Sequence, residues 1–161
     1  MEEIHVKIAE VKTGHPGEIL KATLGSCIGI AFIWKKKEIC GLAHCFLPET
    51  ETEQYTTGAK YVNQAILSLM KLMNIKKEDT RHIEVYLAGA GNMMNQLLKS
   101  HNSQIGKNNA EAAHKYLREY GFRIKEENLG ANRGSKIRVN CTEGTVEFIL
   151  LEEINYYAWK V

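Results

Sequence analysis

Two consecutive apolar runs, residues 28–34 and residues 39–47, are joined by the short polar segment KKKE. Apolar runs of this length, bounded by turn-forming residues, favour strands. Pro48 ends the second run because proline cannot donate to a strand ladder. The pattern predicts an antiparallel hairpin that must lie against a core, and it constrains the fold more than any other feature of the chain.

The register of this hairpin decides which side chains meet. If KKKE closes the turn so that Trp34 faces Ile39, then His44 lies opposite Gly29. Cys27, two residues before Gly29, then shares the face of His44, because side chains alternate along a strand. Cys27 and His44 become diagonal neighbours, roughly 7–8 Å apart between Cα atoms. A shift of one residue would send His44 to the other face.

The two faces of the first strand differ in bulk. Ala31 and Gly29 follow Cys27 on its face, whereas the reverse face carries the four large residues Ile28, Ile30, Phe32 and Trp34. Glycine inside a strand often marks the close approach of a ligand or another backbone. We therefore expect an open face beside Cys27, with room at Gly29 across from His44, and a dense core on the reverse face.

A cysteine beside a histidine is the minimum for thiolate catalysis. The base takes the thiol proton, lowers the apparent thiol pKa and later protonates the leaving group. Gly25 and Ser26, directly before Cys27, could present backbone N–H groups to an oxyanion. Thr23, Ser26 or an asparagine could orient the imidazole of His44. The alternative is an inert buried cysteine beside a hydrogen-bonded core histidine, since free cysteine is among the most buried residue types.

The remaining chain predicts two helices and further strands. A helix over residues 57–73 follows from one apolar stripe, namely Val62, Ala65, Ile66, Leu69, Met70 and Met73. A second helix is expected to begin at Asn109 as its N-cap and to end before Gly121. Alternation predicts strands from Ile4 onward and over 83–87, 136–141 and 145–151, and a short helix is expected over 92–99. Strands with two helices between them indicate one α+β domain over residues 1–161.

Composition and charge exclude several classes of function. A net charge of +2 is too small to indicate nucleic-acid binding. The segment MEEIHVKIAE lacks the basic and apolar regions of a signal peptide, and the apolar run 28–34 is far short of the roughly 20 residues that span a bilayer. We therefore expect a cytoplasmic protein without membrane insertion, whose four cysteines are reduced thiols.

Other candidate sites are weaker. Cys40, His44 and Cys45 lack the paired spacing of a structural zinc site, and Cys45 points away from the other two. The segment LAGAGNMMN lacks the third glycine of a dinucleotide fingerprint, and GANRGSK suits a surface loop better than an anion site. The sequence therefore predicts no metal and no cofactor.

Six motifs together resemble the chemoreceptor glutamine deamidase family, CheD. In chain order they are LGSCIGIAF, GLAHCFLP, AKYVNQAI, LAGAGNMM, IGKNNAEAA and GANRGSKIRV. The resemblance covers about residues 5–150 and leaves 152–161 as a tail. It implies a fold shared with the catalytic domains of cytotoxic necrotizing factor toxins, with Cys27 as nucleophile and His44 as base. The family also uses a threonine shortly before the cysteine, and Thr23 is the candidate in this chain.

The resemblance implies hydrolysis of glutamine side-chain amides to glutamate on methyl-accepting chemotaxis receptors, without a cofactor. It also implies regulation by a CheC-type phosphatase. Because the substrate glutamines lie on long receptor helices, the open face is expected to admit a helix. One rival interpretation is a catalytically weak adaptor that binds receptors and CheC. Another is an unrelated cysteine hydrolase or thiol-redox protein.

Overall fold

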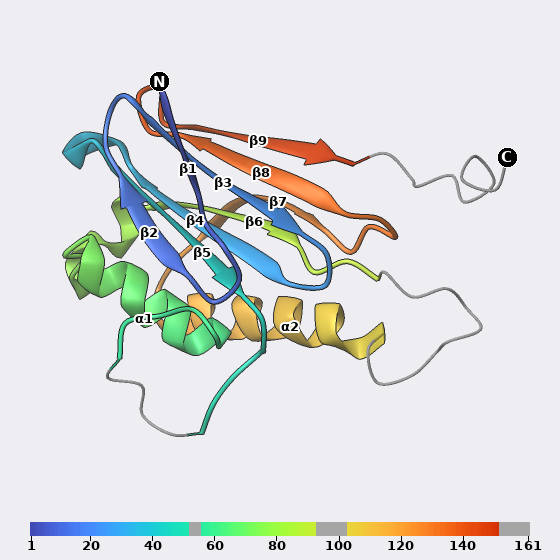
Figure 1. Cartoon of the computed structure of the whole chain (residues 1–161). Coiled ribbons are helices and arrows are strands. Elements are labelled where there is room, and N and C mark those ends of the chain that lie inside the picture. Colours follow the sequence, from blue (N-terminus) through green and yellow to red (C-terminus); the bar gives the residue numbers. More distant parts are fainter. Residues whose placement is uncertain (52–55, 93–102, 152–161) are drawn as a thin grey trace, which may run out of the picture.

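The predicted hairpin forms the centre of a five-stranded sheet in the computed structural model, which describes residues 1–51, 56–92 and 103–151 (Figure 1). Strands β4 (Ile28–Trp34) and β5 (Ile39–Cys45) are joined by a single 3-10 turn, η1 (Lys35–Lys37). Trp34 pairs with Ile39 and Gly29 pairs with His44. The predicted register is therefore confirmed.

The strands form two sheets of mixed direction. The larger has the order β2 (Val11–Gly14), β5, β4, β6 (Glu84–Gly89) and β7 (Ile124–Leu129), with only β6 and β7 parallel. The smaller has the order β1 (Glu2–His5), β3 (Glu18–Leu24), β8 (Ser135–Asn140) and β9 (Thr145–Leu150), with only β1 and β3 parallel. The expected α+β class is confirmed.

Helices α1 (Val62–Leu72) and α2 (Ser103–Glu119) cover the face of the larger sheet that is turned away from the smaller sheet (Figure 1). The molecule thus has three layers, and the short 3-10 helix η2 (Lys77–His82) leads into β6. Ile28, Ile30 and Phe32 of β4 pack in one buried cluster with helix residues such as Leu69 and Leu117. This cluster is the dense core that the sequence predicts behind Cys27.

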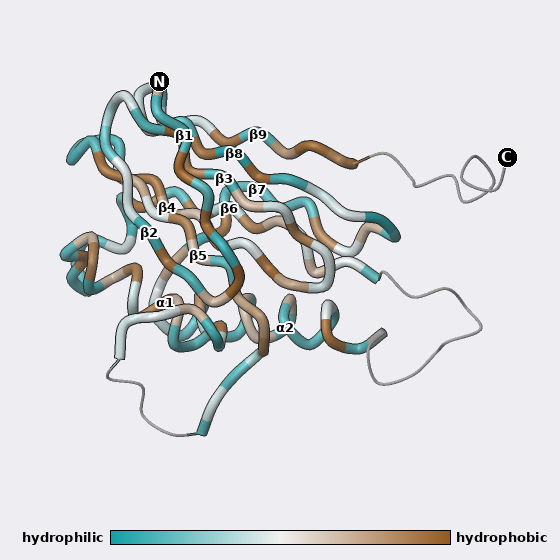
Figure 2. Tube along the Cα trace, viewed as in Figure 1, coloured by the Kyte–Doolittle hydropathy of each residue, from teal (hydrophilic) through white to brown (hydrophobic). Residues whose placement is uncertain are grey.

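The opposite face of β4 is also covered. Ala31 and Ile33 pack in a second buried cluster with Leu20, Leu24 and Ile137 of the smaller sheet. Every residue of β4 is buried. Figure 2 shows hydrophobic segments along the central strands β4 and β5. The prediction of an open face beside Cys27 is therefore wrong: the small side chains on this face accommodate a second sheet.

Gly29 illustrates the reason. A Cβ atom added at Gly29 would lie 2.9 Å from Cδ1 of Leu24 and 3.5 Å from Cγ2 of Ile137. The close approach that a strand glycine indicates is thus made by the smaller sheet. Small residues on one face of a strand indicate that something packs closely there. They do not indicate whether a ligand or another sheet does so.

The helix ends agree in part with the prediction. Gly121 has a left-handed φ of 86°, and the N–H of Phe122 donates to the carbonyl of Leu117 at 2.8 Å, which is the expected glycine C-cap. Asn109, however, is no N-cap, because α2 already begins at Ser103. Helix α1 begins at Val62, five residues later than predicted, since residues 56–60 are not helical.

Three strands, β2, β3 and β7, were not predicted, and one was misplaced. Strand β2 has only four residues. Strand β7 has no buried residue, and strand β3 mixes lysine and threonine with its buried residues. The strand predicted from Ile4 onward ends at His5. The helix predicted over 92–99 and the tail 152–161 lie, apart from Asn92, outside the described residues. No helix in the described part of the chain is long and apolar enough to cross a membrane.

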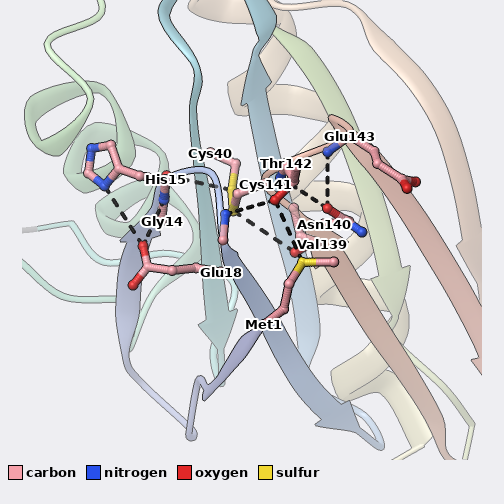
Figure 3. The surroundings of a disulfide bond; sticks show 11 residues. Met1, Gly14, His15, Glu18, Cys40, Val139, Asn140, Cys141, Thr142 and Glu143 are labelled. Carbon is pink, nitrogen blue, oxygen red and sulfur yellow. Dashed lines mark hydrogen bonds and ion pairs between the residues drawn. A yellow bond between two sulfur atoms is a disulfide. The ribbon is translucent and has the colours of Figure 1, made fainter.

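Cys40 and Cys141 form a disulfide that joins the two sheets (Figure 3). Cys40 lies on β5, Cys141 directly follows β8, and their Cα atoms are 5.8 Å apart, within the normal range for a disulfide. The expectation of four reduced thiols is therefore wrong for this pair. That expectation followed from the expected cytoplasmic location. Cys40 and Cys141 come close together because the two sheets pack against each other, which the sequence does not reveal. Cys27 and Cys45 are free and buried.

Candidate active site

Cys27 and His44 lie between the two sheets, at the end of the hairpin opposite the η1 turn. His44, on β5, lies opposite Gly29 of β4, and Cys27 immediately precedes β4. Both side chains are nearly inaccessible, with exposed fractions of 7% for Cys27 and 4% for His44. The structure therefore brings the predicted pair to one face of one sheet. Neighbouring Cys45 belongs to the cluster on the helix side of that sheet.

A backbone carbonyl orients the imidazole. Nδ1 of His44 lies 3.0 Å from the carbonyl oxygen of Val6, in the segment that follows β1. Because a carbonyl only accepts hydrogen bonds, Nδ1 of the neutral ring carries the proton and donates it to Val6. Nε2 then keeps its lone pair and is available to take a proton. The arrangement gives His44 the tautomer that a general base for Cys27 requires.

The Val6 contact was not found from the sequence. Thr23, Ser26 and asparagine were the predicted orienting groups, and a backbone carbonyl has no side-chain signature that could have revealed it. Val6 is itself held in place, since it is buried and its N–H donates to the carbonyl of Lys21 at 2.8 Å.

Burial sets the charge state of both groups. Desolvation lowers the pKa of His44, and His5 lowers it further, while the Val6 carbonyl and Glu10 act in the opposite direction. Desolvation also raises the pKa of the Cys27 thiol. The resting pair is therefore an uncharged thiol and an uncharged imidazole, and the expectation of a lowered thiol pKa is wrong for this state. Within the described ranges, no hydrogen bond joins Cys27 to His44.

Three carbonyls of the loop that carries Cys27 accept hydrogen bonds from the segment after β6 and from α2. The N–H of Gly91 donates to Gly25 at 2.9 Å and the N–H of Ala90 donates to Cys27 at 2.8 Å. The side chain of Asn109 donates to the carbonyl of Ser26 at 3.2 Å. By contrast, no N–H group of residues 25–27 donates to another residue in the part of the chain that the structure describes. The N–H of Cys27 contacts its own thiol, and donors without another partner suit a developing oxyanion.

Glycines allow this close bracing. Gly89 has a φ of 88°, and a Cβ atom there would lie 2.4 Å from the carbonyl oxygen of Cys27. A Cβ atom at Gly91 would lie 3.1 Å from the carbonyl oxygen of Gly25. A side chain at Gly89 would push the Cys27 loop away, and one at Gly91 would first meet the carbonyl oxygen of Ala131, at 2.8 Å. The segment AGAGN therefore supports this loop, and its glycines allow the close contact.

Thr23 is not brought to the pair. It is exposed on β3, where its neighbours Ala22 and Leu24 point inward, and it pairs with Lys136 of β8. Its side chain thus lies on the outer face of the smaller sheet, whereas Cys27 and His44 lie under the inner face. The spacing of Thr23 from Cys27 could not reveal this, because it depends on the unpredicted strand β3.

The three residues that were considered and rejected as zinc ligands are not brought together. Cys40 is bonded to Cys141, and Cys45 faces the helices. Among the described residues, no group of three His, Cys, Asp or Glu side chains could hold a metal ion.

Known proteins with similar sequences decide the family. Residues 46–149 match the family described as CheD chemotactic sensory transduction. The chain belongs to the CheD family. A relative from Ruegeria sp. (strain TM1040), named "Probable chemoreceptor glutamine deamidase CheD 2", is 35% identical and covers 89% of each chain. CheD relatives from Bdellovibrio bacteriovorus and Methanococcus maripaludis, with the corresponding name, are 35% and 33% identical over 85% and 89% of this chain, and 88% and 92% of their own.

Among solved structures, the hypothetical protein YfiH of Bacillus licheniformis superposes with a TM-score of 0.48 at 14% identity, covering 76% of this chain and 51% of that one. The CheD assignment rests on the sequence relatives. It agrees with the family whose motifs the sequence resembles.

Proposed function

We propose that this CheD-family chain hydrolyses glutamine side-chain amides on methyl-accepting chemotaxis receptors to glutamate. The names of its relatives, which cover most of both chains, support the substrate class. The observation that carries the mechanism is the contact between Nδ1 of His44 and the Val6 carbonyl, which leaves Nε2 as a base on the face shared with Cys27.

In the first half of the reaction, Nε2 of His44 takes the thiol proton as the sulfur of Cys27 attacks the amide carbon. The amide oxygen becomes an oxyanion beside the free N–H groups of residues 25–27. The proton then moves from His44 to the leaving nitrogen, the C–N bond breaks, and ammonia departs from a thioester. Because burial raises the pKa of the Cys27 thiol, proton transfer accompanies the attack rather than preceding it.

In the second half, His44 removes a proton from water, and the resulting hydroxide attacks the thioester. The C–S bond breaks, His44 returns the proton to the sulfur, and glutamate is released. Protonated His44 cannot act in either half, so activity falls as the imidazole is protonated. Because the pKa of His44 lies below its ordinary value, activity persists into mildly acidic solution.

Mass spectrometry of a receptor cytoplasmic fragment tests this function. We expect the intact protein to convert specific glutamines to glutamate and Cys27→Ala to convert none. The matched control is Cys45→Ala, which removes the other free thiol, on the opposite face of the sheet. Absence of conversion by the intact protein would contradict the function for that receptor, and conversion by Cys27→Ala would contradict the mechanism.

CheD-family membership also supports a CheC-type phosphatase as a regulatory partner and a cytoplasmic location beside the receptor signalling domains. We expect a CheC-type protein to slow conversion of the receptor fragment in the same assay. Unchanged conversion at saturating CheC would exclude regulation at this site.

A catalytically weak adaptor is the second candidate, and one observation favours it. Both Cys27 and His44 are nearly inaccessible in the structure, so a receptor helix has to gain access to them before chemistry can occur. An adaptor would bind the receptor fragment with equal affinity with Cys27 intact or replaced by alanine, and would convert no glutamine in either form. Conversion that depends on Cys27 excludes it.

A further inference from the structure

Asn109 is a completely buried polar residue in the middle of α2. Its face of the helix is otherwise apolar, with Ala112, Ala113 and Leu117 in the cluster between helices and sheet. Nδ2 donates to two carbonyls, those of Ser26 and Phe46, each at 3.2 Å. Oδ1 is buried and has no partner among the described residues. Such a group calls for an explanation, because burial without a partner is costly.

The two carbonyls belong to the two halves of the candidate active site. Ser26 directly precedes Cys27, and Phe46 follows His44 by two residues. The two N–H groups of one carboxamide therefore join the loop that carries the nucleophile to the strand end that carries the base. Among the described residues, no other side chain makes hydrogen bonds to both segments.

The contact with Ser26 also sets the direction of a catalytic donor. The peptide unit between Ser26 and Cys27 is planar and trans, so its C=O and its N–H point in opposite directions. Asn109 holds the C=O toward α2 and thereby turns the N–H of Cys27 away from α2. That N–H donates to no other residue in the described chain. Its direction is what an oxyanion donor requires.

We propose that Asn109 is a positioning residue whose carboxamide aims the backbone N–H of Cys27 at the oxyanion. The proposal rests on the thiol mechanism described above. Loss of the carboxamide would remove an unpaired buried oxygen but would also leave the carbonyls of Ser26 and Phe46 without this donor, so the test has to separate positioning from stability. The N-cap role that the sequence predicts for Asn109 is excluded, because α2 begins at Ser103.

Two reactions of Cys27 separate positioning from general structural damage. Acylation by p-nitrophenyl acetate passes through a tetrahedral oxyanion, whereas alkylation by iodoacetamide displaces iodide at a saturated carbon and forms none. Both form a bond to the sulfur, and Cys27→Ala gives the background of each. In Asn109→Leu we expect acylation to slow roughly 10²-fold, the scale on which misplaced catalytic groups act, with alkylation changed less than about threefold. Receptor deamidation should lose kcat with KM unchanged.

Asn108→Leu is the matched control, because Asn108 is the exposed neighbour of the same residue type in the same helix. It should leave both reactions unchanged. Asn109→Ala is the second variant and serves if leucine prevents folding, which circular dichroism would reveal. Equal slowing of acylation and alkylation in the folded variant, or no slowing of either, would overturn the proposal.

The design also separates this proposal from the proposed function. If the intact protein is acylated at Cys27 but converts no receptor glutamine, the receptor function fails while the Asn109 comparison still applies. If the intact protein is neither acylated nor able to deamidate, the oxyanion site is absent and the role of Asn109 falls with it.

Discussion

Cys27 and His44 share a buried position, and burial acts on their pKa values in opposite directions. It raises the thiol pKa and lowers the imidazole pKa, and both shifts favour the uncharged pair. Strand pairing was enough to predict that the two residues share a face, because the register of a short hairpin is a local property. The Val6 carbonyl could not be predicted, since it comes from a distant segment and acts through its backbone.

The lowered pKa of His44 makes folding depend on pH. Between its folded pKa and about 6.5, the ordinary value, the unfolded chain binds a proton that the native state does not, so stability falls as pH decreases through this window. We expect the free energy of unfolding in urea to fall less between pH 7 and pH 5 in His44→Asn than in the wild type. Each unit of the pKa difference contributes up to about 1.4 kcal/mol.

His82→Asn is the control for this experiment, because His82 is exposed. Equal pH dependence of the wild type and His44→Asn would show that His44 is not held neutral in the native state.

At the scale of elements, α2 both packs against the larger sheet and contacts the segments that position the Cys27 loop. It contributes Asn109, and it passes so close to the segment after β6 that a Cβ atom at Gly106 would lie 2.5 Å from the carbonyl oxygen of Ala90. Strands with strongly apolar patterns, such as β4 and β6, were predicted almost to the residue. Strand β7 was missed because its pattern is polar and its pairing partner, β6, lies far away in sequence.

Gly106→Ala tests the closeness of this contact. Alanine is the better helix former by about 1 kcal/mol, so an unconstrained helix would be stabilised. Here the methyl group meets backbone atoms, which cannot move aside without displacing the segment that supports the Cys27 loop. We expect a net loss of roughly 1–3 kcal/mol in the free energy of unfolding, together with reduced deamidation. Urea denaturation measures the first effect.

Lys107→Ala is the control, as an exposed neighbour in the same helix. A stabilised Gly106→Ala protein would show that α2 and the segment after β6 are not in close contact.

At the scale of the whole molecule, the two sheets are held together by an apolar core and by one covalent link. The disulfide joins residues separated by 101 positions and links the start of β5 to the residue after β8 (Figure 3). The fold class could be predicted from the sequence, because the alternation of apolar residues in strands and the apolar stripe of a helix are local patterns. The stacking of two sheets did not, since small residues on a strand face are compatible with a cleft or with another sheet.

Reduction of this disulfide should destabilise the native state by about 2–4 kcal/mol, because a long loop of the unfolded chain is released. The measurement is urea denaturation of the wild type with and without dithiothreitol. The free energy of unfolding of Cys141→Ser should not depend on dithiothreitol and should resemble that of the reduced wild type. Identical transitions of the wild type in both conditions would mean that the link contributes nothing to the unfolding equilibrium.

The bracing of the Cys27 loop has a consequence for protein synthesis. A ribosome completes residues 27 and 44 early, but the groups that hold this loop, Gly91 and Asn109, are made later. The N–H of Asn92 in turn donates to the carbonyl of Ala131, which is made later still. An incomplete chain therefore carries a nucleophile and a base without the scaffold that aligns them. Alignment of Cys27 with His44 therefore has to wait until the ribosome has made the segment around Ala131.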